Sequence, residues 1–136
     1  MNRTLVLAEW RLARNALRAA QLLARHGIYA DAVSRAYYAV LHAAKAALQT
    51  KDISADSHAA VRRLFGLHFI KTGEFEREWS SPLAEGLDDR LAADYDGERQ
   101  FTGREARDES RRAAAFLKRV RRFLRTQGLA PAQLDG

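Results

Sequence analysis

The sequence contains no cysteine and only two prolines among its 136 residues. Without cysteine, the chain can form neither disulfide bonds nor a thiolate zinc site, and it has no cysteine nucleophile. No apolar run approaches the roughly 20 residues of a membrane-spanning helix, and arginines interrupt the N-terminal apolar segment too often for a signal peptide. We therefore expect a soluble, cytoplasmic protein that does not enter a membrane.

The composition is basic as well as apolar. Hydrophobic residues make up 47% of the chain, enough for the core of one domain. Lysine and arginine outnumber aspartate and glutamate by 23 to 17, which gives a net charge of +6. Such an excess favours anionic partners, above all nucleic acid. A solvated, arginine-rich surface would give the same composition, so the charge leaves both interpretations open.

Apolar residues recur at helical spacing, and no segment alternates like a β-strand. The predicted helices span residues 5–25, 29–50, 57–71, 82–95 and 104–127. Ser81 and Pro82 are typical of a helix start, as N-cap and first helical residue. The connections are short, so five helices without a strand predict an all-α antiparallel bundle. We expect this bundle to span residues 1–127 and a loose C-terminal tail to follow at 128–136.

The second predicted helix carries one continuous polar face. At 100° per residue, its polar side chains fall within a sector of about 80°. These residues are Asp31, Arg35, Tyr38, His42, Lys45 and Gln49. Arg35 and His42 lie two turns apart, about 10 Å along the axis, with Tyr38 between them. Tyr37 falls on the opposite side and is predicted to point into the core.

Arg35, Tyr38 and His42 together suit phosphate chemistry. A guanidinium can bind a phosphate through two hydrogen bonds, an imidazole can exchange a proton near neutral pH, and a phenol can orient either group. Every amphipathic helix also has a polar face, and a histidine there is usually solvated or bonded to a neighbour. Spacing alone leaves both interpretations open.

A second arginine and histidine, Arg63 and His68, compete with this set. They stand about 140° apart on an unbroken helix, so they would meet only around a distortion, which Gly66 permits, or across a subunit contact. No two histidines have the i,i+4 spacing of a zinc site, and no acidic cluster accompanies them. We therefore expect no metal and no other cofactor.

The last helix is rich in basic residues that spread around it instead of forming one stripe. They are Arg107, Arg111, Arg112, Lys118, Arg119, Arg121, Arg122 and Arg125. They indicate either a solvated basic surface or contact with a nucleic-acid backbone. The candidate ligands for RNA phosphates are Lys45, Arg111, Arg112, Arg119 and Arg122. Ion pairs can also absorb such charges, and we expect Arg90 and Asp94, at i,i+4, to form one on the surface.

Three segments of the chain resemble the HEPN superfamily, in particular the small single-domain HEPN proteins of bacteria and archaea. The segments read "ADAVSRAYYAVLHAAKAAL", "SHAAVRRLFGLHFIKTGE" and "RLAADY". The resemblance extends over about residues 5–124. It implies a bundle of four long helices with a shorter extra helix, packed as a two-fold dimer. Proteins of this kind are often encoded beside a minimal nucleotidyltransferase (MNT), as toxin and antitoxin, so the resemblance also implies an MNT-type partner.

The resemblance further implies an activity and an RNA substrate. Many HEPN proteins are metal-independent ribonucleases with an R-x(4–6)-H motif, and the dimer brings two motifs into one cleft. The arginine engages the scissile phosphate, and the histidine transfers protons as the ribose 2′-hydroxyl attacks, which leaves a 2′,3′-cyclic phosphate. Arg35 with His42 fits this motif and shares its face with Tyr38, so we prefer these three as catalytic residues. Arg63 and His68 also fit and are the runner-up pair.

The chain departs from the family pattern at three positions. The commonest form has a polar residue directly after the arginine, where this chain has Ala36 and Leu64. A form seen in some toxins has tyrosine where this chain has Ile70. Some HEPN proteins are inactive partners or scaffolds. Two functions therefore stay open: an RNA-cleaving toxin, and a non-catalytic HEPN module that binds a nucleotidyltransferase or a nucleotide.

Overall fold

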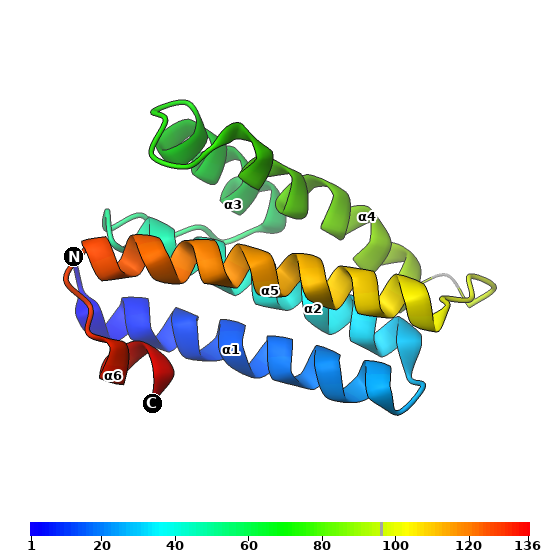
Figure 1. The fold of residues 1–136 in the computed structure, drawn as a ribbon. Helices are drawn as coiled ribbons and strands as arrows, with labels where there is room; N and C mark the ends of the chain where they lie inside the picture. Colours follow the sequence, from blue (N-terminus) through cyan, green and yellow to red (C-terminus); the bar gives the residue numbers. More distant parts are fainter. Residues whose placement is uncertain (96) are drawn as a thin grey trace.

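Long helices form the body of the protein in the computed structural model (Figure 1). It describes residues 1–95 and 97–136, except for the side chains at 86–89, 91 and 92. The elements are α1 (Arg3–Arg25), α2 (Tyr29–Gln49), α3 (His58–Phe65), a π-helical turn (Gly66–Ile70), a 3₁₀ turn (Arg77–Ser80), α4 (Ser81–Tyr95), α5 (Gly103–Thr126) and α6 (Pro131–Asp135). The described residues contain no strand, so the predicted all-α fold is confirmed. None of their helices is long and apolar enough to cross a membrane.

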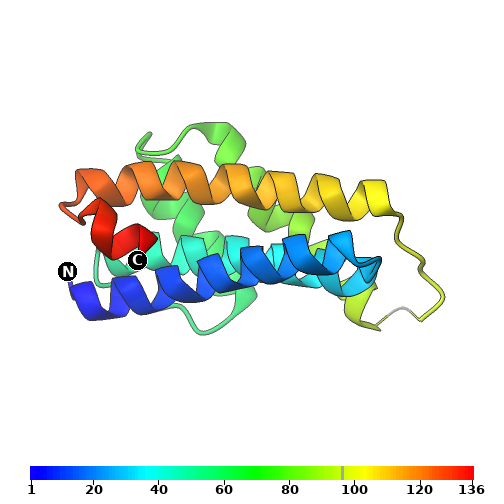
Figure 2. The same cartoon turned by 60° about the horizontal axis from the view of Figure 1, so that its bottom comes forward.

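The helix α2 lies at the centre of the bundle. It packs against α1, α3, α4 and α5, and successive long helices run antiparallel, as Figures 1 and 2 show. Its buried face is rich in alanine, including Ala39, Ala43 and Ala46, which are fully buried. Small side chains let the neighbouring helices approach closely. As predicted, Tyr37 is buried in this core and Tyr38 is only half-buried.

Phenylalanine rings join α3 and the following segment to α5. Neighbouring rings lie 5.1–5.7 Å apart between centroids, in tilted or edge-to-face pairs. The rings belong to Phe65, Phe69, Phe75, Phe116 and Phe123. Because all but Phe123 are almost fully buried, they hold α3 and the π-helical turn firmly against the bundle.

Two segments differ from the predicted helices. The third helix changes to a π-helical turn at Gly66, where the Lys71 amide donates to the Gly66 carbonyl at 2.9 Å. Gly66 thus provides the distortion that the sequence permits. The 3₁₀ turn runs directly into α4, so Ser81 has helical dihedral angles, φ −60° and ψ −45°. The prediction of Ser81 as an N-cap is therefore wrong.

The C-terminal residues are packed against the bundle, and the expectation of a loose tail at 128–136 is wrong. Gly128, with φ +92°, turns the chain after α5, and α6 follows. Leu129 and Leu134 are both buried. The Trp10 indole Nε1 donates to the Leu134 carbonyl at 2.8 Å. The two buried leucines and the buried hydrogen bond from Trp10 therefore hold the C-terminal residues against the bundle.

Candidate functional site

The polar face of α2 lines an open groove against α1. This hollow of about 440 Å³ is lined by Leu12, Asn15, Ala16, Ala19, Arg35, Tyr38 and His42. A second hollow of about 420 Å³ shares Arg35 and Tyr38 and extends to Asp94 on α4. The structure thus brings the three preferred catalytic side chains to one surface that solvent reaches. We call this surface the Arg35 groove.

Glu9 of α1 holds His42 in place. Its Oε2 lies 2.7 Å from His42 Nδ1, and its Oε1 lies 3.5 Å from Lys45 Nζ. Burial alone would raise the pKa of Glu9, but the hydrogen bond with His42 and the charge of Lys45 outweigh it, so the pKa falls below its ordinary value of 4.5. An ionised carboxylate only accepts hydrogen bonds, so Nδ1 of His42 carries the hydrogen. Nε2 is then left for chemistry in the groove.

Tyr38 links the two ends of the Arg35 groove. Its ring stacks with the His42 ring, with centroids 6.4 Å apart and planes inclined by 20°. The Arg35 Cζ lies 5.5 Å from the Tyr38 centroid. Within the described part of the chain, the Arg35 guanidinium has no hydrogen-bond or ion-pair partner. Because the Arg35 side chain is also exposed, its positive charge is available to bind an anion.

The buried Arg90 of α4 holds the Tyr38 side chain in place. Arg90 donates through Nη2 to the Tyr38 hydroxyl at 2.7 Å, and its Cζ lies 5.0 Å from the ring centroid. The predicted pair with Asp94 is present, with Arg90 Nε 3.1 Å from Oδ2, although the N–H is not aimed along a hydrogen bond. Arg90 is only 9% exposed, so the expectation of a surface ion pair is wrong.

His58, the first residue of α3, lies beside Tyr37 and Tyr38. Its Nδ1 is 3.2 Å from the Tyr37 hydroxyl, and its ring centroid is 6.5 Å from that of Tyr38. Burial, together with the positive charges of Arg90 and Lys45, lowers the pKa of His58. His58 is therefore neutral at neutral pH and adds no charge to the Arg35 groove.

The HEPN domain family matches residues 7–127, which is most of the chain. The chain belongs to the HEPN family. This match includes every residue that lines the Arg35 groove, and it confirms the family that the sequence motifs indicate.

Several known proteins are similar to this chain over most of its length. "Putative toxin MJ0605" of Methanocaldococcus jannaschii is 36% identical over 84% of this chain and 84% of its own length. "Putative toxin MJ0142" of the same organism is 31% identical over 90% of this chain and 84% of its own. A "UPF0332 protein" of Thermotoga maritima is 29% identical over 88% of this chain and 91% of its own. The likeness therefore covers nearly whole chains.

The second match to the HEPN motif, Arg63 with His68, is not brought together. Arg63 lies exposed on α3, and His68 stands in the π-helical turn. No described hydrogen bond, ion pair or ring contact joins their side chains, and neither lines the Arg35 groove. The backbone carbonyl of His68 accepts from Lys51 Nζ at 3.0 Å and from Thr72 Oγ1 at 2.9 Å, which are structural roles.

Of the five predicted phosphate ligands, only Lys45 lies beside the Arg35 groove, through its contact with Glu9. Arg112 bonds to Glu85 and Glu109. Arg119 is largely buried and pairs with Glu76 at 2.9 Å. These pairs leave less positive charge for a ligand than the sequence suggests.

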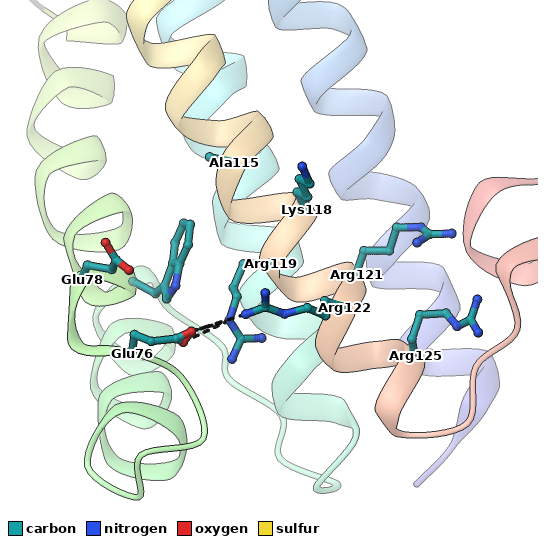
Figure 3. Close-up of a pocket in the computed structure, with 9 residues that line it drawn as sticks. Glu76, Glu78, Ala115, Lys118, Arg119, Arg121, Arg122 and Arg125 are labelled. Atoms are coloured by element: carbon teal, nitrogen blue, oxygen red, sulfur yellow. Dashed lines mark hydrogen bonds and ion pairs between the residues drawn. The ribbon is translucent and has the colours of Figure 1, made fainter.

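The C-terminal half of α5 nevertheless gathers several cations in one place. Figure 3 shows the hollow of about 710 Å³ there, with Glu76 directed toward Arg119 and Arg122. The basic residues that line it are Lys118, Arg119, Arg121, Arg122 and Arg125. These five residues line one hollow although they cover a sector of about 160° around the helix. Arg111 stands apart, in a different hollow.

Within the described residues, no three His, Cys, Asp or Glu side chains are grouped so as to hold a metal ion. The Arg35 groove itself offers three groups: a carboxylate-bound imidazole, an unpaired guanidinium and a fixed phenol. Sequence spacing on α2 identified Arg35, Tyr38 and His42 but missed Glu9 and the role of Arg90. The sequence did contain one indication of Glu9, because it is the single acidic residue of α1.

Replacing Glu9 by glutamine should make the protein less stable at neutral pH by about 1–2 kcal/mol. The folded pKa of Glu9 is lowered, so its contribution is present above pH 4.5 and is lost as the pH falls through the folded pKa. Urea denaturation of both proteins should therefore show a difference at pH 7 that disappears at acid pH. Glu78→Gln, at an exposed carboxylate, is the control. A difference independent of pH would contradict the Glu9–His42 assignment.

Proposed function

We propose that this HEPN protein is a metal-independent endoribonuclease that acts as the toxin of a toxin–antitoxin pair. The observation that carries the proposal is the Arg35 groove, where an imidazole bound to Glu9 lies on the same surface as an unpaired guanidinium. Two relatives carry the word toxin in their names, which supports the biological role. The antitoxin that fits the family resemblance is an MNT-type nucleotidyltransferase.

The proposed reaction is a transesterification within the RNA. Arg35 donates hydrogen bonds to the scissile phosphate. Nε2 of His42 accepts the proton of the 2′-hydroxyl, and the 2′-oxygen forms a bond to phosphorus. The bond from phosphorus to the 5′-oxygen breaks, and that oxygen takes a proton from a second imidazole. The products are a 2′,3′-cyclic phosphate and a 5′-hydroxyl.

A two-fold dimer supplies the second imidazole in this proposal, as His42 of the partner subunit. The surface of α1 beside the Arg35 groove supports this arrangement. Leu5 and Leu12 are exposed there, and Leu12 lines the groove itself. Exposed leucines next to a polar site favour an interface between two copies of the chain. Sedimentation should then give twice 15.3 kDa, and a monomer at micromolar concentration would remove the composite site.

Cleavage of RNA and DNA of the same sequence, in buffer with EDTA, tests this function. RNA should be cut without metal, and DNA should stay intact because it lacks the 2′-hydroxyl that attacks. Equal cleavage of DNA, or cleavage that stops in EDTA, would contradict the mechanism.

A second candidate function is a non-catalytic HEPN module that binds a nucleotidyltransferase or a nucleotide. It is favoured by Ala36, which stands where the family commonly has a polar residue and is 1% exposed. Position 36 faces the core, so no polar group there reaches the Arg35 groove. Intact RNA after incubation with a folded dimer, together with RNA or nucleotide binding, would support this alternative.

A further inference from the structure

A second basic hollow lies between α1 and α5, away from the Arg35 groove. It has a volume of about 410 Å³ and is lined by Gln21, Ala24, Arg25, Tyr29, Arg107, Ser110, Arg111 and Ala114. At 100° per residue, the α1 residues of this hollow point about half a turn away from those of the groove. The two surfaces are therefore on opposite sides of α1. We call the second one the Arg107 pocket.

The positive charge of the Arg107 pocket is largely uncompensated. Within the described part of the chain, Arg25 and Arg107 have no hydrogen-bond or ion-pair partner. Among the described residues, Arg111 pairs only with Asp108, with Nη1 3.3 Å from Oδ1, and both side chains are exposed to water. Exposed pairs of this kind contribute little and break readily. Three guanidinium groups at one hollow favour an anion with several acceptor oxygens.

A buried hydroxyl supplies an independent sign of a ligand. Ser110 is only 6% exposed, and its Oγ has no hydrogen-bond partner among the described residues. A buried hydroxyl without a partner costs free energy, and this one belongs to a residue that lines the pocket. In its present rotamer the hydroxyl is closed off from solvent, and a rotation about the Cα–Cβ bond toward the pocket would bring it to an acceptor oxygen bound at the base.

Gly103, in the first turn of α5, leaves space for two side chains that line the Arg107 pocket. A Cβ atom at Gly103 would lie 2.9 Å from Arg107 Nη1 and 3.0 Å from the Tyr29 hydroxyl. Glycine at 103 therefore lets the ends of Arg107 and Tyr29 pack over this turn. Any side chain at this position would push both of them away from their present places.

We propose that the Arg107 pocket binds the phosphate group of a phosphate ester. Arg25 and Arg107 donate to the phosphate oxygens, and the Ser110 hydroxyl donates to an oxygen at the base. The volume suits a phosphate with its attached sugar. Two sources carry this chemistry: a phosphate of the RNA chain beyond the cleaved bond, and a free phosphomonoester. The first rests on the proposed function, whereas the second stands without it.

Phosphate binding is measured directly, so its result is separate from any result on cleavage. The probes are inorganic phosphate, AMP and a short oligoribonucleotide, added to ¹⁵N-labelled protein that carries His42→Ala so that RNA is not consumed. The signals are the backbone amides of residues 103–111 and the affinity from their titration. Arg107→Gln and Ser110→Ala are compared in this background with Arg104→Gln, which makes the same charge change on α5 at a side chain that is 87% exposed.

Arg107→Gln should weaken phosphate binding by about 10-fold, and Ser110→Ala by about 3-fold or more, because charged hydrogen bonds contribute more than neutral ones. Arg104→Gln should leave the affinity nearly unchanged. If Arg107→Gln loses oligoribonucleotide binding but keeps AMP binding, the ligand is a phosphate of the RNA chain. If it loses AMP binding but keeps oligoribonucleotide binding, the ligand is a free phosphomonoester. Equal effects of Arg104→Gln and Arg107→Gln, or no shifts at residues 103–111 with any probe, would overturn the proposal.

Discussion

Replacing His42 by alanine should slow RNA cleavage by about 10²–10⁴-fold, the usual contribution of a general acid–base group. Within the described residues, no other histidine lines the Arg35 groove. In the proposed mechanism, the imidazole held by Glu9 is therefore the group that accepts the 2′-hydroxyl proton. Single-turnover cleavage of an oligoribonucleotide in EDTA measures the effect, with both proteins checked for folding by circular dichroism.

Two other histidines serve as controls for this prediction. His26→Ala removes an exposed side chain at the end of α1 and should leave the cleavage rate unchanged. His68→Ala tests the runner-up pair and should also leave it unchanged, because His68 does not line the groove. Loss of cleavage in His68→Ala alone would move the site to Arg63 and His68. Unchanged cleavage in His42→Ala would remove His42 from the mechanism and contradict the proposed site.

Replacing Leu134 by alanine should lower the free energy of unfolding by about 2–5 kcal/mol, the usual cost of a leucine removed from a core. Leu134 is fully buried although only two residues follow it in the sequence, and its carbonyl accepts from Trp10. Urea denaturation measures the change. Leu67→Ala, which makes the same substitution at an exposed site, should cost far less. Equal small losses in both variants would mean that α6 contributes little stability.

The polar face of α2 was predictable because spacing along one helix fixes the direction of each side chain. Arg35, Tyr38 and His42 lie on one side, and Tyr37 lies in the core, as expected. The contact of Glu9 with His42 depends instead on how α1 is rotated and shifted against α2. Periodicity within a single helix carries no information on that register.

The same limit explains two of the corrections, the burial of Arg90 and the packed C-terminal tail. An i,i+4 spacing correctly paired Arg90 with Asp94, but burial of Arg90 follows from the packing of α4 over Tyr38. The helix α6 has only five residues, too few for a periodic pattern, and isolated helices of that length are not stable. Tertiary contacts of Leu129 and Leu134 decide its structure.

The chemical end group left on RNA by the wild-type protein in EDTA tests the Arg35 groove most directly. Attack by the 2′-oxygen, with His42 as the proton acceptor, predicts a 2′,3′-cyclic phosphate on one fragment and a 5′-hydroxyl on the other. These ends are measured by mass spectrometry of a short oligoribonucleotide of defined sequence. Fragments with a 3′-hydroxyl and a 5′-phosphate, or intact RNA in the presence of a folded dimer, would contradict the proposed activity.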